Sequence, residues 1–136
     1  MIVVFDTNVI VEAIFWPRST ARRALTGLAL RRFKTAVNQA ILDEYAAVTA
    51  ELRARLFPQA QPSGALAWMV AKSVRVEPMP IKRKLSRDPN DNVFVASAAA
   101  ARAAFLVTQD RDLLAREKPF GVQIVTPVQL IHELRL

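Results

Sequence analysis

Residues 2–5 form a run of four apolar side chains, three of them β-branched, that ends at Asp6. The run is too short for a helix, and it fits a strand buried on both faces, as in the middle of a parallel sheet. Apolar positions return at helical spacing over residues 9–15, which predicts a helix there. Asp6 should therefore lie at the carboxyl end of a central strand, where open α/β sheets bind their ligands. The alternative is that Asp6 only caps the following helix.

Strands and helices are predicted to alternate along the rest of the chain. Short strands are expected at residues 33–37, 105–108 and 122–125. Helices are expected at residues 21–32, 39–52, 66–71, 93–104 and 127–134, with a short one at residues 113–114 and a loop over residues 53–64. This alternation favours an α/β fold with a parallel sheet and right-handed crossovers. A length of 136 residues indicates a single domain, residues 1–136.

Several classes of protein are disfavoured by what the chain lacks. It has no cysteine, which rules out disulfides, thiolate catalysis and zinc–sulfur sites. Its one histidine, His132, argues against a histidine-rich metal site and is expected at the surface. No stretch reaches the roughly 18 apolar residues of a membrane span, and the first residues lack the basic start of a secretory signal. We therefore expect a cytoplasmic protein with no membrane contact.

The charge balance indicates a polyanionic partner. The formal net charge is +7 and the sequence pI is about 10.8. Basic residues gather in two runs, one over residues 18–34 and one just before an acidic motif. The alternative is a solvated basic surface without a specific partner. The candidate residues for binding such a polyanion, nucleic acid above all, are Arg18, Arg22, Arg23, Lys82, Arg83, Lys84 and Arg87.

Two adjacent acids lie on the predicted helix at residues 39–52. Neighbours on a helix point about 100° apart, so Asp43 and Glu44 cannot share one environment. Glu44 is three residues from Ile41 and four from Val48, so it borders the apolar face, while Asp43 should face water. A carboxylate on the core side needs a partner or a cation to offset its desolvation. Glu44 is the predicted functional acid of the pair.

A strand followed by an acid occurs again late in the chain. Asp110 follows the predicted strand at residues 105–108, as Asp6 follows the first strand. Asp110 or Asp112 could also cap the next short helix. The parallel with Asp6 predicts that Asp110 lies at the same edge of the sheet.

A further pair of acids opens the helix predicted at residues 93–104. Asp88 with Pro89 fits an N-cap followed by proline at the first helical position, which is a sufficient structural role for Asp88. Asp91 would lie in the first turn, where the helix dipole favours an anion by up to about 1 kcal/mol. Small apolar residues follow, so this helix should pack tightly on the sheet and hold Asp91 near the strand ends.

Four acids could thus converge on one edge of the sheet, namely Asp6, Glu44, Asp91 and Asp110. Each close pair would repel by roughly 3–4 kcal/mol at an effective dielectric of about 20, and without help one or more would protonate. A divalent cation removes the repulsion, and oxygen ligands select Mg²⁺ or Mn²⁺. Such a metal can generate a hydroxide and stabilise displacement at phosphorus. With the basic runs, the pattern predicts a metal-dependent phosphodiesterase for nucleic acid.

Four segments carry a combination of motifs that covers essentially the whole chain. They are Phe-Asp-Thr-Asn-Val at residues 5–9, Leu-Asp-Glu-Tyr at 42–45, Arg-Asp-Pro-Asn-Asp-Asn at 87–92 and Leu-Val-Thr-Gln-Asp-Arg-Asp-Leu-Leu at 106–114. Ile-Val-Thr-Pro at 124–127 fits as well. Together they resemble PIN-domain ribonucleases, most of all the VapC-like toxins of bacterial type II toxin–antitoxin systems.

The resemblance implies a three-layer α/β/α sandwich and an endoribonuclease that uses Mg²⁺ or Mn²⁺. On it, the four converging acids hold the metal and an activated water, and the protein is a homodimer whose site is blocked by a protein antitoxin. Its supporting polar residues would be Thr7, Asn8 and Thr108, with Asp88 and Asp112 as auxiliary candidates. The chain departs from the family pattern at Gln109, where a small residue is usual, and at Ala104, often an aspartate. Gln109 could alter access to the site.

Other readings of the same residues remain. A haloacid-dehalogenase-type phosphatase needs an aspartate two residues after the first one, and that position is Asn8. A receiver domain needs an acidic pair and a late lysine that the chain does not offer. The remaining alternative is a non-catalytic RNA-binding or regulatory protein on the same scaffold, which loss of any of the four acids would have favoured.

Overall fold

The computed structural model describes residues 1–78 and 91–136, with side chains in the second range from residue 93 onward. The strands are β1 (Val3–Phe5), β2 (Thr35–Val37), β3 (Ser73–Arg75), β4 (Phe105–Val107) and β5 (Gln123–Val125). The helices are α1 (Thr7–Phe15), α2 (Thr20–Ala29), α3 (Gln39–Leu56), α4 (Pro62–Ala71), α5 (Asp91–Ala100), α6 (Arg111–Leu114) and α7 (Pro127–Leu134), with a 3₁₀ turn η1 at Pro119–Gly121.

The strands form a parallel sheet whose order reverses beside β1. β4 lies between β1 and β5, and β2 pairs with β3, each pair in parallel register. A parallel bridge between Ile2 and Lys34 joins the two groups, so the order is β3-β2-β1-β4-β5. The strands that follow β1 in the chain, β2 and β3, therefore lie on one side of it, and the later strands β4 and β5 lie on the other side. The carboxyl ends of β1 and β4 border that switch point, where such sheets bind ligands.

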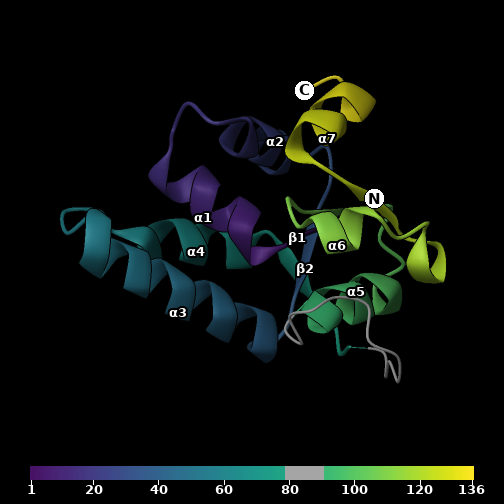
Figure 1. Ribbon diagram of the computed structural model, residues 1–136, viewed down its shortest axis with the longest axis horizontal. Coiled ribbons are helices and arrows are strands. Elements are labelled where there is room, and N and C mark those ends of the chain that lie inside the picture. The colour runs from purple at the N-terminus through teal and green to yellow at the C-terminus, as the bar shows by residue number, and fades with distance from the viewer. Residues whose placement is uncertain (79–90) are drawn as a thin grey trace.

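Helices cover the sheet on both sides, as the sequence predicts. α5 contacts β1, β2 and β4, while α7 contacts β4, β5 and α2. In Figure 1, α2 and α7 lie above the strands and α5 lies below them. Every residue of β1, β2 and β4 is buried, as expected for strands covered on both faces. The mainly parallel sheet and the three-layer α/β/α arrangement are thus confirmed. In the described ranges, every helix is too short or too polar to traverse a bilayer.

Buried polar contacts tie α3 to the sheet near the switch point. The Asn38 side chain caps α3 by accepting a hydrogen bond from the backbone of Ile41, at 3.0 Å. Its amide nitrogen donates to the Val76 carbonyl at 3.2 Å and to Ser97 Oγ at 2.8 Å. One buried side chain therefore joins the end of β2, the residue after β3 and the helix α5, which holds the start of α3 beside the strand ends.

Several predicted element ends differ from the observed ones. The loop predicted over residues 53–64 is wrong at both sides, because α3 continues to Leu56 and α4 already begins at Pro62. Proline is tolerated at the first helical position, where the missing N–H would have no partner anyway. Two arginines in the last turn of α3, Arg53 and Arg55, favour its extension through the helix dipole. The short strand β3 and the turn η1 were not predicted.

Two helices end earlier than their periodicity predicts. α2 ends at Ala29 rather than at residue 32, and α5 spans Asp91–Ala100 rather than residues 93–104. Each is followed by an arginine in the left-handed region, Arg31 with φ 59° and Arg102 with φ 53°. Left-handed residues close helices by letting later N–H groups bond back to the last turn, as Arg32 does to Gly27 and Ala103 to Ala98.

The adjacent residues Trp68 and Met69 of α4 have different surroundings. Met69 is 3% exposed, but Trp68 is 38% exposed. Adjacent helical residues point about 100° apart, and α4 packs mainly on α3 and β3, so only one of the two can face inward. His132 is exposed, as predicted.

Gly27 in α2 provides a test of core packing. A Cβ at this position would overlap the ring of Phe33, which is 3% exposed and lies 5.8 Å from the Phe5 ring, centroid to centroid. Overpacking of this kind costs about 3 kcal/mol, more than the roughly 1 kcal/mol that alanine gains over glycine in a helix. We expect Gly27→Ala to lower the free energy of unfolding by about 2 kcal/mol, measured by urea denaturation.

Gly64 in α4 is the matched control. A Cβ there meets no atom within 4 Å, so Gly64→Ala should be neutral or stabilising by up to about 1 kcal/mol. Equal unfolding free energies for the two variants would mean that the Phe33 ring yields without cost, contrary to the packing described here.

Candidate active site

Asp6 is a buried acid at the carboxyl end of β1. It is 3% exposed, and its backbone N–H donates to the Val107 carbonyl of β4 at 2.9 Å, the last rung of that pair. Its Oδ1 accepts the Thr7 backbone N–H at 2.8 Å, so Asp6 also caps α1. Capping satisfies one helical N–H, yet it does not explain why a charged group is held in a buried place. Asp6 therefore does cap α1, but capping alone does not account for its burial.

Thr108 links Asp6 to the loop that carries Asp110. The fully buried Thr108 hydroxyl donates to Asp6 Oδ2 at 2.7 Å and accepts the Asp110 backbone N–H at 2.9 Å. Asp110 in turn caps α6 by accepting the Asp112 N–H at 2.8 Å. The structure therefore brings Asp6 and Asp110 to the same edge of the sheet, on the two strands that border the switch point. Asp110, rather than Asp112, is the cap of α6.

Glu44 approaches the same edge from α3 through its neighbour Tyr45. Tyr45 is fully buried and its hydroxyl donates to the Phe5 carbonyl at the end of β1. Burial raises the pKa of this hydroxyl well above its usual value, and the charges of Asp6 and then Glu44 raise it further. Both carboxylates therefore lie near the phenol. Glu44 is half-buried, whereas Asp43 is exposed and accepts a hydrogen bond from Gln39, as predicted for this pair.

The supporting residues Thr7 and Asn8 are at the start of α1. The Asn8 side chain donates to Asp6 Oδ2 at 3.4 Å and accepts the Gln109 backbone N–H at 3.3 Å, so it connects the two strand ends. Thr7 contributes its backbone N–H to Asp6. Its buried hydroxyl has no hydrogen-bond partner among the described residues. Thr7 and Asn8 thus both donate a hydrogen bond to the Asp6 carboxylate. Their functional roles remain predictions.

The fourth predicted acid is only partly described. Asp91 begins α5, which packs against β1 and β4. The middle of that helix is buried, in agreement with the predicted tight packing on the sheet, and comprises Phe94, Val95, Ala96, Ser97 and Ala98. The Asp91 side chain lies outside the described part of the chain. So do Asp88, with its predicted N-cap role, and the second basic run, Lys82, Arg83, Lys84 and Arg87.

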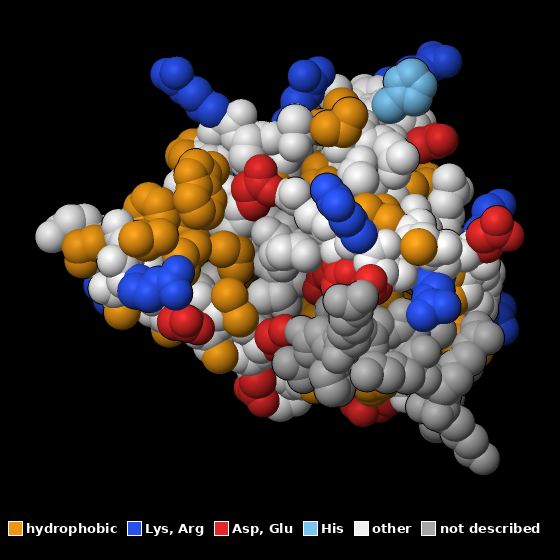
Figure 2. Space-filling view, in the orientation of Figure 1, with side chains coloured by type: hydrophobic (Ala, Val, Ile, Leu, Met, Phe, Trp, Pro, Cys, Tyr) orange, Lys and Arg blue, Asp and Glu red, His pale blue; other side chains and the backbone are white. Residues whose placement is uncertain are grey.

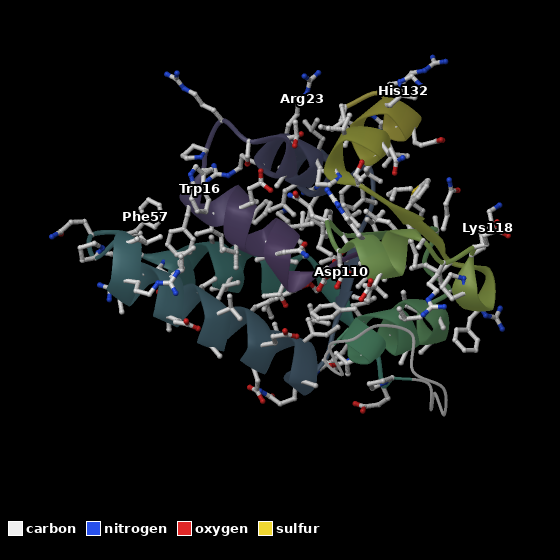
Figure 3. The ribbon with its side chains drawn as sticks, viewed as in Figure 1. Trp16, Arg23, Phe57, Asp110, Lys118 and His132 are labelled. Atoms are coloured by element: carbon white, nitrogen blue, oxygen red, sulfur yellow. The ribbon has the colours of Figure 1, made fainter. Side chains whose placement is uncertain are left out.

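The described donors suit a hard divalent cation. They are carboxylate, hydroxyl and amide oxygens, the ligand set of Mg²⁺ and Mn²⁺ rather than of zinc or copper. Among the side chains that the structure describes, no three acids or histidines surround one point closely enough to hold a metal. The contribution of Asp91 to a metal site on this edge remains a prediction. Acidic side chains gather near the middle of the face in Figure 2, where Figure 3 labels Asp110.

The first basic run does not form one patch beside the acids. Arg22 donates to the Ala13 carbonyl at 2.6 Å, and Arg23 donates to the C-terminal Leu136 carbonyl at 3.0 Å. Figure 3 shows Arg23 toward α7, well away from Asp110. Arg18 is different, because it is exposed just after α1 and borders a cavity with Trp16. Binding of RNA by Arg18, Arg22 and Arg23 remains a prediction.

Two contacts at the site were not identified from the sequence. Gln109 donates through its side-chain amide to the Glu12 carboxylate, which fixes the loop after β4 to α1. Glu12 lies four residues after Asn8, and this spacing places both on one face of α1, a signal that could have identified it. The second contact is the hydrogen bond that the buried Tyr45 hydroxyl donates to the Phe5 carbonyl at the end of β1.

The arrangement of motifs and strands agrees with a comparison against protein families. A model of the PIN domain matches residues 2–112. The chain belongs to the PIN-domain family. This match confirms the predicted family and its fold. PIN domains are generally nucleases that use divalent metal ions. The sequence matches none of the curated proteins.

Solved structures give the same fold. The crystal structure of VapBC2 from Rickettsia felis, bound to a DNA fragment from their promoter, contains a similar chain with a TM-score of 0.58. The similarity covers 92% of this chain and 97% of that one, at 18% sequence identity. At this identity the likeness concerns the fold, which agrees with the VapC-like architecture that the motifs predict for this PIN domain.

Proposed function

We propose that this PIN domain is a metal-dependent endoribonuclease that cleaves RNA phosphodiester bonds and serves as the toxin of a toxin–antitoxin pair. The observation that carries the proposal is the Thr108 hydroxyl, which joins Asp6 of β1 to the Asp110 loop of β4 at the switch point of the sheet. The charges of Asp6 and Glu44 both raise the pKa of the Tyr45 hydroxyl, which donates to the Phe5 carbonyl at that strand end. The proposed metal-binding and catalytic residues are Asp6, Glu44, Asp91 and Asp110.

The residues of the chain have separable tasks in this proposal. Asp6 and Asp110 hold the metal from two adjacent strands, and Thr108 fixes their spacing through its two hydrogen bonds. Asn8 orients Asp6 and the loop at Gln109. The buried phenol of Tyr45 donates to the Phe5 carbonyl, and its raised pKa keeps it protonated at alkaline pH as well. A bound Mg²⁺ or Mn²⁺ supplies charge stabilisation at phosphorus and a more acidic water.

RNA is the proposed substrate because the chain is strongly basic outside its acidic edge. A net charge of +7 attracts phosphates and strengthens the encounter with a polyanion. The acids would repel an RNA strand without a cation, so substrate binding and metal binding should be linked. The cytoplasm, where RNA is abundant, is the proposed location.

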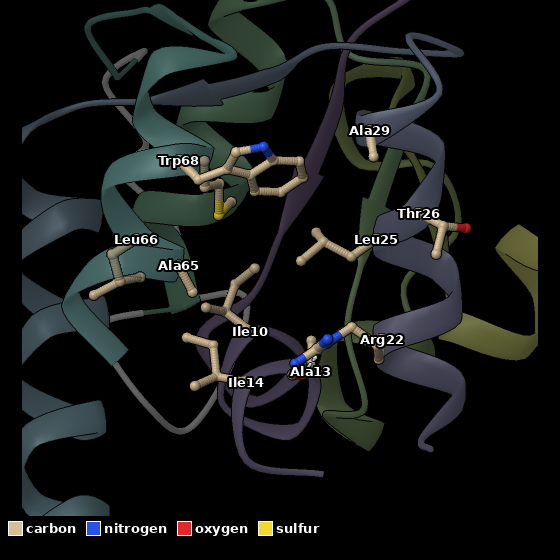
Figure 4. Close-up of a pocket in the computed structure, with 11 residues that line it drawn as sticks. Ile10, Ala13, Ile14, Arg22, Leu25, Thr26, Ala29, Ala65, Leu66 and Trp68 are labelled. Carbon is tan, nitrogen blue, oxygen red and sulfur yellow. Dashed lines mark hydrogen bonds between the residues drawn. The ribbon is translucent and has the colours of Figure 1, made fainter. Parts of the chain in front are cut away.

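The proposed protein partners are an antitoxin and a second copy of the chain. The similar Rickettsia felis structure is of VapBC2 with DNA. In the present chain, an apolar cavity of about 360 Å³ lies between α1, α2 and α4 (Figure 4). It includes Ile10, Ile14, Leu25, Leu66 and the exposed Trp68. An exposed apolar surface of this kind suits a protein partner, so it is the proposed antitoxin surface.

Metal removal tests the proposal. We expect purified protein to cleave single-stranded RNA with Mg²⁺ or Mn²⁺ and to lose at least about 100-fold of that rate in EDTA, because uncompensated carboxylates repel both one another and the phosphate. The readout is cleavage of end-labelled RNA, with metal restored afterwards as the control for reversibility. Tight RNA binding without cleavage in any metal would instead favour the non-catalytic RNA-binding alternative.

A further inference from the structure

An open groove runs along α1 from the acidic edge to an exposed aromatic residue. It encloses about 500 Å³, within the range of about 300–1,000 Å³ of small-molecule sites. One end is at Asn8, which donates to Asp6, and at Gln109, the residue before Asp110. The other end is at Trp16. The groove is lined by Asn8, Val11, Glu12, Trp16, Val48 and Gln109.

Trp16 is held in a fixed orientation although it is 46% exposed. Its ring meets Phe57 edge-on, with centroids 5.3 Å apart and planes at 85°. Phe57 stacks on the buried Phe15 ring at 5.1 Å. Figure 3 shows Trp16 and Phe57 side by side at the end of α1 that is remote from Asp110. An indole fixed at its edge and open to solvent is a preformed stacking surface.

The same indole also borders a second cavity, where a positively charged side chain lies. This second cavity, of about 550 Å³, is bordered by Glu12, Trp16, Pro17, Arg18 and Ser19. Arg18 is exposed there. The order along α1 is therefore acids, groove, indole and guanidinium. This order matches the parts of a nucleotide chain, in which a metal-bound phosphate precedes an apolar base and another phosphate.

Polar groups at the rim of the groove can contact the edge of a base. Glu12 and Gln109 both line the groove, and the Gln109 amide donates a hydrogen bond to the Glu12 carboxylate. A carboxylate is an acceptor only, so it selects N–H donors. Guanine presents two adjacent donors, N1–H and N2–H, on its Watson–Crick edge, whereas adenine presents one.

We propose that this groove binds an unpaired RNA base close to the scissile phosphate, stacked on Trp16 with its Watson–Crick edge against Glu12 and the following phosphate near Arg18. The proposal rests on the proposed ribonuclease function and adds a specificity site to it. A base can stack on the indole only where it is unpaired and has left its neighbours, so single-stranded RNA rather than a duplex is the expected ligand.

The chain contains only two tryptophans, which permits a direct optical test. Asp6→Asn with Trp68→Phe leaves Trp16 as the sole indole in a protein expected not to cleave its probe. Probes are a uridine hexamer with one central guanosine, the same hexamer with adenosine, and a duplex RNA, each with Mg²⁺. We expect the guanosine hexamer to quench Trp16 emission. Asp6→Asn with Trp16→Phe, which keeps Trp68 as reporter, is the matched control and should show no quenching.

Affinity and cleavage complete the test. Trp16→Ala should weaken hexamer binding about 5- to 100-fold, as for loss of one base–aromatic stack, and Trp16→Phe should retain most of it. Glu12→Gln should remove the preference for guanosine over adenosine. RNA cleavage by the wild type with unchanged kcat/KM in Trp16→Ala, and no quenching, would overturn the groove proposal alone. Quenching without any cleavage would uphold the groove and overturn the nuclease, and absence of all RNA binding would overturn both.

Discussion

Asp6→Asn is expected to reduce RNA cleavage by at least about 100-fold while leaving the protein folded. Loss of a residue that only supports a metal ligand costs about 10- to 100-fold, so loss of a direct carboxylate ligand should cost no less. The substitution keeps the size of the side chain. The amide oxygen can still accept the Thr7 N–H, and the amide nitrogen can donate to the Thr108 hydroxyl. The measurement is kcat/KM for RNA at saturating Mg²⁺.

Stability and metal binding separate the catalytic effect from misfolding. Removing a charge that is 3% exposed and close to Glu44 relieves desolvation and repulsion, so the Tm without metal should be equal to or above that of the wild type. Calorimetric Mg²⁺ binding should weaken in parallel with activity. Full activity in Asp6→Asn would place the chemistry elsewhere on the protein, and a large fall in Tm would assign Asp6 to capping alone.

Glu44→Gln and Asp43→Asn form the second test, on adjacent residues of α3. Glu44 is half-buried and raises the pKa of Tyr45 at the strand end, whereas Asp43 is exposed and accepts a hydrogen bond from Gln39 on the same helix. We expect Glu44→Gln to lower kcat/KM at least about 10-fold. Asp43→Asn removes the same charge one residue away and should change it less than about twofold at moderate salt, since exposed charges are screened.

Comparing Glu44→Gln with Asp43→Asn controls for net charge, because both variants lose one negative charge on the same helix. Each substitution also replaces a carboxylate by the amide of the same size, so the helix is changed little. The RNA cleavage assay can be repeated at two salt concentrations to identify long-range electrostatic effects. Equal effects of the two substitutions would mean that Glu44 acts through the overall field rather than at the site, and it would leave the metal without its ligand from α3.

Local sequence patterns were sufficient for the centre of the sheet and for three of the four acids. A run of apolar residues that stops at a polar one predicts both a buried strand and its end, so Asp6 and Asp110 could be placed correctly from residues 2–8 and 105–112. The 100° step between helical neighbours likewise distinguished Glu44 from Asp43. These features depend on backbone periodicity, which is encoded within a few residues.

Other features depend on contacts between distant residues and were not predictable in this way. Trp68 has a large apolar side chain of the kind common in protein cores. However, α4 packs with Met69 inward, which leaves the indole exposed. The helices α2 and α5 end at left-handed arginines, although arginine carries no strong signal for that conformation. The contact between Gln109 and Glu12 joins residues that are 97 positions apart.

The sequence by itself determined that the protein is an α/β domain of the PIN family with acids at its strand ends, because apolar periodicity and short motifs act locally. Only the tertiary structure decided how these acids are positioned. The Thr108 hydroxyl joins Asp6 to the Asp110 loop, the Tyr45 phenol donates to the Phe5 carbonyl at the end of β1, and α1 carries a groove that extends to Trp16. Such arrangements arise when strands and helices far apart in the chain pack together. Their hydrogen bonds and exposed surfaces follow from the complete fold, since no single segment contains both partners.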